Sequence, residues 1–197
     1  IAGFETPTEG QILLGDKDVT KIPANERGMG FVFQNYALFP HMKIFDNVAY
    51  GLRIRKESND VIAKKVKEAL AMVGLEKAEH RYPNQLSGGQ CQRLVIARAL
   101  LRSDSAVYIF DEAASNIDVE SEELIMNVIH ELAKTKTVLL ISHRLANVVQ
   151  SDQIYFLKNG TICERGTHAE LMEQNGAYCH LYDSQMVLEN YGKEGNA

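Results

Sequence analysis

The chain has 197 residues and a formal charge of −5, from 21 Lys and Arg against 26 Asp and Glu. This balance argues against sequence-independent binding to nucleic acid, which needs a surplus of basic side chains to displace counterions from phosphate. Apolar residues make up 45% and charged residues 24%, so disorder and coiled coil are excluded in favour of an ordinary globular protein.

Short apolar runs alternate with helical patterns along the chain, which predicts an α/β fold built on a mostly parallel sheet. The runs at 30–33, 107–110 and 137–141 are continuous rather than alternating, as expected for strands that are buried on both faces. Each run is followed by polar side chains. Because parallel strands end at one edge of a sheet, these side chains are expected to converge there on one site; they are Gln34, Asp111, Glu112 and His143.

Three helices are predicted from apolar stripes, over 59–73, from Ser87 to about Arg102, and over 119–134. An Asn-Gly pair at 159–160 predicts a hairpin between short strands at 154–157 and 161–164, and 168–191 reads as short polar helices. With no linker or repeat in the sequence, we expect one domain over 1–197, with a helical subdomain at about 45–104 inserted in the α/β core.

Neither membrane insertion nor disulfide formation is expected. No apolar run reaches the roughly 18 residues that a membrane span needs. The three cysteines, Cys91, Cys163 and Cys179, lie far apart in the sequence and suit a reduced compartment.

The pentapeptide Leu86-Ser87-Gly88-Gly89-Gln90 opens the second predicted helix. Ser87 is a suitable N-cap, the glycines allow another surface to approach the backbone closely, and the first helical turn has N–H groups without intrahelical partners. A helix start of this kind attracts anions. An isolated Ser-Gly-Gly is more often an ordinary capped turn, but here Gln92 and Arg93 follow, and then an apolar strand that ends in Asp-Glu.

These segments together resemble the nucleotide-binding subunit or domain of ATP-binding cassette (ABC) transporters, over nearly the whole chain. LSGGQ at 86–90 matches the family's signature motif, VYIFDE at 107–112 its Walker B strand, and Ser115-Asn116-Ile117-Asp118 its D-loop. Gln34 fits the Q-loop and His143 the switch histidine. The resemblance implies a P-loop NTPase-like fold, with ATP and Mg²⁺ as cofactors and ATP hydrolysis as the reaction.

The resemblance also implies a role for each matching residue. Asp111 is the Mg²⁺ ligand, Glu112 orients or deprotonates the attacking water, and Gln34 ligates Mg²⁺ or positions water. His143 donates a hydrogen bond where negative charge accumulates on the terminal phosphate. Without the family, Gln34 reads as a polar residue ending a strand.

In this family two cassettes sandwich ATP head to tail, so the resemblance implies a second cassette and a transmembrane permease subunit or domain as partners. Leu86, Ser87, Gly88, Gly89 and Gln90 are then expected to cap nucleotide bound by the opposite cassette, with Asp118 steadying the interface. The expected location is cytoplasmic, at the inner face of the cell membrane and held there by the membrane partner.

The chain contains no G-x-x-x-x-G-K-[ST], the loop whose backbone and lysine cradle phosphates. The family has that loop immediately before the segment that matches the first ten residues, so we expect an N-terminally truncated cassette that is inactive alone. A truncated cassette, a chimeric one and a degenerate one would each lack this loop, and the sequence does not distinguish them. Two alternatives to a transporter subunit stay open, namely a non-catalytic remnant that offers its signature face to a partner and a soluble ABC-type ATPase.

The direction of transport is left undecided by the sequence. Residues 1–90 resemble importer ATPases, whereas 91–197 resemble cassettes of exporters. The stretch 35–48 is aromatic and apolar, which suits docking to a helix of the membrane subunit or, equally, local core; its large side chains are Tyr36, Leu38, Phe39 and Phe45.

Overall fold

The computed structural model describes residues 1–102, 105–115 and 117–194. The chain forms two compact units, residues 1–141 and 142–197. The expectation of one domain over 1–197 stays a prediction. Residues 103 and 104, at the end of the predicted helical subdomain, lie outside the described residues.

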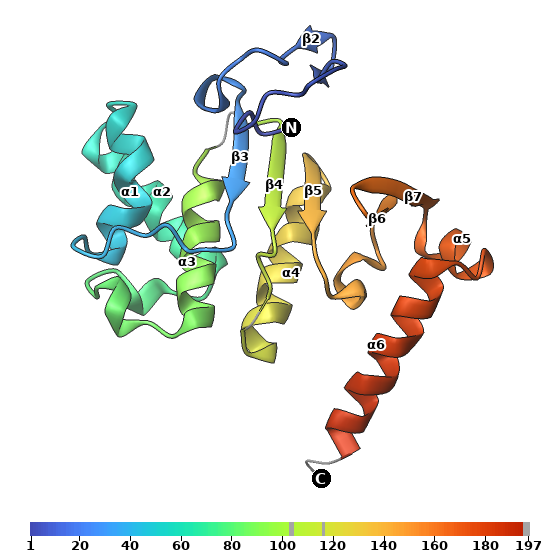
Figure 1. Ribbon diagram of the computed structural model, residues 1–197. Coiled ribbons are helices and arrows are strands. Elements are labelled where there is room, and N and C mark those ends of the chain that lie inside the picture. The colour runs from blue at the N-terminus through green and yellow to red at the C-terminus, as the bar shows by residue number, and fades with distance from the viewer. Residues whose placement is uncertain (103–104, 116, 195–197) are drawn as a thin grey trace. The chain divides into compact units, whose positions relative to one another are not determined.

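A three-stranded parallel sheet forms the centre of the first unit (Figure 1). Its order is β3 (Met29–Val32), β4 (Val107–Asp111) and β5 (Thr137–Ile141), within a residue or two of the three predicted runs. Gly30 pairs with Tyr108, and a Cβ on Gly30 would lie 2.5 Å from the Tyr108 ring. The ring therefore packs over β3 only because residue 30 has no side chain.

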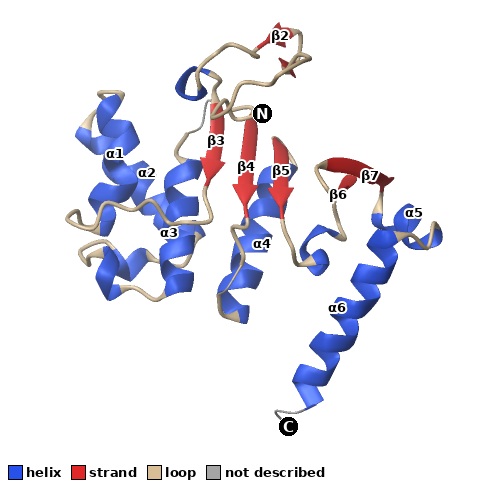
Figure 2. Ribbon diagram, in the orientation of Figure 1, coloured by secondary structure: helices blue, strands red, loops and turns tan. Residues whose placement is uncertain are grey.

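Four helices accompany this sheet (Figure 2): α1 (Ile44–Ile54), α2 (Asn59–Met72), α3 (Gly88–Leu100) and α4 (Val119–Ala133). The helices α2, α3 and α4 confirm the three predicted helices. The sequence analysis did not predict α1. Its interior holds Gly51 and Asn47, both weak helix formers, and Asn47 is tolerated because it is fully buried with hydrogen-bond partners.

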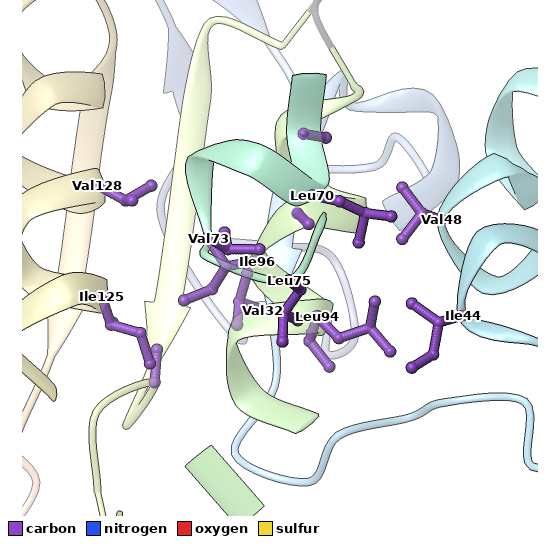
Figure 3. Packing of buried hydrophobic residues seen from close by; sticks show 14 of the residues in the cluster. Val32, Ile44, Val48, Leu70, Val73, Leu75, Leu94, Ile96, Ile125 and Val128 are labelled. Carbon is purple, nitrogen blue, oxygen red and sulfur yellow. The ribbon is translucent and has the colours of Figure 1, made fainter. Parts of the chain in front are cut away.

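One apolar core joins these helices to one face of the sheet. Figure 3 shows Val32 of β3 among side chains of α1, α2 and α3, and Ile125 and Val128 projecting from α4. All of the apolar positions predicted to face inward on α2 are buried, namely Ile62, Val66, Leu70 and the following Val73. The signature helix α3 and the strands that end at the candidate site are thus built on the same core.

The N-terminal segment covers part of the other face of the sheet. It holds the short antiparallel pair β1 (Leu13–Leu14) and β2 (Lys17–Asp18), and then a 3-10 turn, η1 (Ala24–Glu26). Val19, Met29 and Ile109 are buried between this segment and the sheet. Two further 3-10 turns, η2 (Glu76–Ala78) and η3 (Pro83–Gln85), connect α2 to α3.

The second unit begins with the 3-10 turn η4 (Leu145–Val148) and continues with an antiparallel hairpin of β6 (Ile154–Lys158) and β7 (Thr161–Gly166). Asn159 and Gly160 have φ values of 52° and 78°, as the predicted tight turn requires.

Two helices end the second unit, α5 (His168–Glu173) and α6 (Ala177–Glu194). The predicted short polar helices are wrong for α6, which runs for 18 residues. The Glu164 carboxylate of β7 caps it, accepting hydrogen bonds from the backbone N–H groups of Ala177 and Tyr178 at 2.6 and 3.0 Å. A cap supplied from 13 residues away leaves no signal in the helix's own sequence.

Among the described residues no helix combines the length and the apolar character needed to cross a membrane. The parallel sheet with its flanking helices confirms the predicted α/β class.

Candidate functional site

The end of β4 carries two carboxylates, Asp111 as the last strand residue and Glu112 directly after it. Glu112 has a φ of 51°, in the left-handed region that costs a non-glycine residue about 1–2 kcal/mol. Three hydrogen bonds hold this backbone. The Glu112 N–H donates to Ile141 O at 3.0 Å, and the Ser115 N–H and hydroxyl donate to Glu112 O at 3.1 and 2.9 Å.

Gln34 lies two residues beyond β3 and reaches Glu112 from the neighbouring strand. Its Nε2 donates to the Glu112 Oε2 at 2.8 Å. The predicted convergence of strand ends is therefore present for these two side chains, which are 78 positions apart in the sequence. Ser115 lies in the predicted D-loop, and nothing in the sequence indicates that it holds the Glu112 backbone.

The donor set at this edge fits a hard divalent cation. Asp111 offers a carboxylate, and the bond from Nε2 to Glu112 leaves the amide oxygen as the atom of Gln34 that can ligate. No group of three or more His, Cys, Asp or Glu side chains suited to a metal occurs in the described ranges. One or two protein oxygens completed by phosphates and water is the usual arrangement for Mg²⁺, so the residues present fit that ion.

The signature turn, residues 86–90, begins α3 with a reciprocal cap. The Gln90 N–H donates to the Ser87 hydroxyl at 3.3 Å, and the Ser87 N–H donates to the Gln90 Oε1 at 3.1 Å. Ser87 and Gly88 are exposed, Gly89 is buried, and Leu86 packs against the core. The turn thus has a rigid, capped start with exposed backbone at the positive end of the helix dipole, which fits a polyanion such as a nucleotide phosphate.

Asp118 is the N-cap of α4. Its Oδ1 accepts the Ser121 N–H at 2.8 Å. Hydrogen bonds from the Ser121 backbone and side chain lower the pKa of Asp118, and the positive charge of Arg93 acts in the same direction. Asn116, in the middle of the predicted D-loop, lies outside the described residues.

His143, two residues after β5, belongs to the second unit. Gln185 of α6 holds its segment at two points, donating from Nε2 to His143 O at 2.7 Å and accepting the Leu145 N–H on Oε1 at 2.9 Å. Gln185 was not predicted as a functional residue, because the sequence of a polar helix does not reveal a contact 42 positions away. The convergence of His143 with Asp111 and Glu112 stays a prediction.

The loop after Gln34 is held by Asn47, whose side chain is fully buried. Its Oδ1 accepts the Phe39 N–H at 2.8 Å, and its Nδ2 donates to Phe39 O and Met42 O, both at 3.0 Å. Phe39 packs against Tyr50 with the rings tilted and their centroids 4.6 Å apart, and the Arg98 guanidinium lies 5.7 Å from the Phe39 ring centre.

The other large side chains of the stretch 35–48 are partly buried against the core. They are Tyr36, Leu38 and Phe45. The alternative of local core therefore accounts for part of this stretch, while Phe39 and Tyr50 remain half-buried or exposed on its outer side.

Comparison with known proteins gives a consistent result. The family model described as ABC transporter matches residues 1–115. The spermidine/putrescine import ATP-binding protein PotA of Vibrio parahaemolyticus is 43% identical over 177 residues, which are 88% of this chain and 47% of the relative. The Fe(3+) ions import ATP-binding protein FbpC of Rhizobium etli is 43% identical over 176 residues, 88% of this chain and 50% of the relative. The chain spans about half the length of these curated relatives.

Solved structures agree with the sequence relatives. The ATP-bound structure of a bacterial Atm1-family ABC exporter matches with a TM-score of 0.80 and 28% identity, over 93% of this chain and 33% of the exporter chain. A dimeric ATP-binding cassette in a post-hydrolysis state, with ADP and Pi bound, matches with a TM-score of 0.77 and 29% identity, over 85% of this chain and 77% of its own.

Proposed function

Because the chain belongs to the ABC transporter family, we propose that it forms the ATP-binding and ATP-hydrolysing subunit of a transporter that moves a solute across a membrane. The hydrogen bond between Gln34 and Glu112, beside Asp111 at the end of β4, carries this proposal. Import is the proposed direction, because relatives 43% identical over 88% of the chain are named as import proteins.

Each polar group at the strand ends has a proposed task in hydrolysis. Bound ATP and Mg²⁺ supply the phosphoryl group and neutralise its charge. Asp111 and the amide oxygen of Gln34 would hold the ion. Glu112 accepts hydrogen bonds from the attacking water and takes its proton, while Gln34 keeps that carboxylate aimed. His143 donates a hydrogen bond to the terminal phosphate oxygens.

The signature turn is proposed to act on nucleotide held by a second cassette. Ser87, Gly88 and Gln90 would direct a hydroxyl, backbone N–H groups and an amide toward its phosphates. The half-buried Leu86 and the buried Gly89 would hold the turn in place. Asp118, at the start of α4, is proposed to steady the interface between the two cassettes.

The 197-residue chain alone is proposed to be inactive, since it contains no glycine- and lysine-bearing phosphate loop. We expect a purified sample with ATP and Mg²⁺ to release phosphate no faster than buffer. A rate above buffer that disappears in Glu112→Gln would contradict this proposal. A chain without its own rate that still stimulates an intact cassette would favour a non-catalytic partner.

Substitution at Ser87 tests the signature turn directly. Ser87→Asp keeps a good N-cap but adds a negative charge at the point where phosphates are proposed to bind. We expect the wild-type chain to form an ATP-dependent complex with the import protein PotA of Vibrio parahaemolyticus in sedimentation measurements, and Ser87→Asp to lose it. Asn84→Asp adds the same charge at an exposed position outside the turn and should retain the complex. Equal binding by both variants would count against the proposed face.

A permease subunit is the proposed membrane partner, docked on the loop that Asn47 holds, with the cassette at the cytoplasmic face of the membrane. Phe39→Asp places a charge in this loop, and we expect it to abolish capture by the cognate permease in detergent. Met72→Asp, at an exposed apolar position on α2, is the matched control and should be captured normally. Unchanged capture of Phe39→Asp would instead favour a soluble ABC-type ATPase.

A further inference from the structure

The two glycines of the signature turn face different parts of their own chain. A Cβ on Gly88 would lie 3.1 Å from the Tyr36 hydroxyl, the flexible end of a side chain that follows the Q-loop glutamine. A Cβ on Gly89 would lie 2.4 Å from the Ser121 Oγ, 2.5 Å from the Asp118 Oδ2 and 2.8 Å from the Ser121 Cβ. Only Gly89 therefore has neighbours too close to accept a methyl group.

The neighbours of Gly89 are the two residues that make the N-cap of α4. Asp118 accepts the Ser121 N–H on Oδ1 and turns its other oxygen, Oδ2, toward Gly89. Ser121 is buried, so its side chain has little room to move aside. The α3 backbone at Gly89 thus forms one wall of the space that the Asp118 carboxylate occupies.

A second contact between the same segments acts through charge. Arg93, one turn further along α3, contributes to the low pKa of Asp118. Its own position is fixed, because Nη1 donates to Val73 O at 3.1 Å at the end of α2. Ser121, the Asp118 backbone N–H and Arg93 all favour the ionised form of this carboxyl, and only its partial desolvation opposes them.

We propose that Gly89 is a positioning residue for Asp118. The absence of a side chain at residue 89 lets the signature helix and the cap of α4 pack in direct contact, so that a displacement of the signature turn moves the Asp118 carboxylate with it. Gly89 is then required by a contact within this chain. This requirement does not depend on which ligand binds at the exposed Ser87 and Gly88. The packing of Gly89 against Asp118 is independent of the proposed function. Only the role of Asp118 at the interface with an opposite cassette rests on it.

The first test compares Gly89→Ala with Gly88→Ala in the full chain. Alanine favours helix over glycine, so without a steric conflict both changes would raise the denaturation midpoint. We expect Gly88→Ala to raise it or leave it unchanged and Gly89→Ala to lower it. In Gly89→Ala the Ser121 amide should exchange at least about tenfold faster, because its cap is displaced.

The Asp118 carboxyl gives a readout that general destabilisation does not move. We expect its pKa, followed by NMR, to rise toward the ordinary aspartate value in Gly89→Ala and to stay low in Gly88→Ala. An unchanged Asp118 pKa together with an unchanged Ser121 exchange rate in Gly89→Ala would overturn the proposal.

Removing the obstructing side chain supplies the rescue. Ser121→Gly deletes both Ser121 atoms nearest to residue 89. The decrease in denaturation midpoint caused by Gly89→Ala should therefore be smaller in the Ser121→Gly background than in the wild-type chain. The matched cycle of Gly88→Ala with Ser121→Gly should be additive. If Gly89→Ala does not fold, recovery of folding by Ser121→Gly supports the proposal and failure to recover overturns it.

These outcomes are separate from those of the proposed function. Loss of the ATP-dependent complex in Ser87→Asp concerns the exposed turn and does not test the contact between Gly89 and Asp118. Conversely, an unchanged Asp118 pKa in Gly89→Ala would contradict this inference even if the ATP-dependent complex still forms.

Discussion

Two loops of the molecule are each held by one amide side chain, and the two amides differ in their surroundings. Asn47 in the first unit is fully buried and bonds to backbone groups of the loop after Gln34. Gln185 in the second unit is half-buried and bonds to the backbone around His143. Water can replace the partners of Gln185 but not those of Asn47. The loop next to the Walker B edge is therefore fixed by the core, and the histidine loop by a bond that competes with solvent.

The largest expected effects test whether the cores of the two units are equally stable. Leu94 of α3 and Leu171 of α5 are both fully buried. We expect Leu94→Ala and Leu171→Ala each to cost about 2–5 kcal/mol of unfolding free energy in its own unit. Hydrogen exchange resolved along the sequence measures both losses. A cost below about 1 kcal/mol for Leu171→Ala would show that the core of the second unit contributes less to stability than the core of the first.

Removing the buried amide comes next in size. Asn47→Ala deprives the Phe39 N–H of its partner inside the protein, and we expect a cost of about 1–3 kcal/mol in chemical denaturation. Asn84→Ala, at an exposed position, is the control and should stay within about 0.5 kcal/mol of wild type. Equal midpoints for the two variants would contradict the contrast drawn between the loops.

A smaller effect is expected from Gln185. Gln185→Ala should cost about 1 kcal/mol or less and speed amide exchange at Leu145, because water replaces the lost acceptor. Gln185→Glu keeps an acceptor for Leu145 while losing the donor to His143 O, so it should protect Leu145 better than alanine does. Slower or unchanged exchange in Gln185→Ala would show that this clamp does not hold the loop.

The smallest effect concerns charge at the start of α5. Hydrogen bonds from the Thr167 N–H and hydroxyl lower the pKa of Glu170. A lowered pKa stabilises the fold above the ordinary glutamate value of 4.5, and that contribution is lost as the pH falls through the pKa of the folded state. Thr167→Val keeps the backbone donor and removes the hydroxyl, so the Glu170 pKa, followed by NMR, should rise part of the way. No rise would exclude the hydroxyl as a cause.

Much of the first unit could be predicted because its signals are local. Continuous apolar runs defined β3, β4 and β5, and the polar residues after them defined the pair of Gln34 and Glu112. The apolar stripe of α2 and the N-cap at Ser87 could be predicted for the same reason.

The elements that escaped prediction depend on partners that lie outside the element itself. The helix α1 contains a buried asparagine whose partners lie in the preceding loop, and α6 begins at a carboxylate supplied by β7. The contact of Gly89 with Ser121 is of the same kind, since nothing in LSGGQ reveals which surface its glycines meet. Sequence patterns predicted where the polar residues after the strands lie, whereas the contacts that support them became visible only in three dimensions.

Under the role proposed for Glu112, its left-handed backbone sets activity against stability at a single position. Glycine is the residue that this geometry favours, so Glu112→Gly would relieve local strain while deleting the carboxylate. A single substitution would thus give a more stable chain that lacks this carboxylate. Glu112→Gln keeps the same backbone demand and the same side-chain length, which makes it the cleaner chemical probe of this carboxylate.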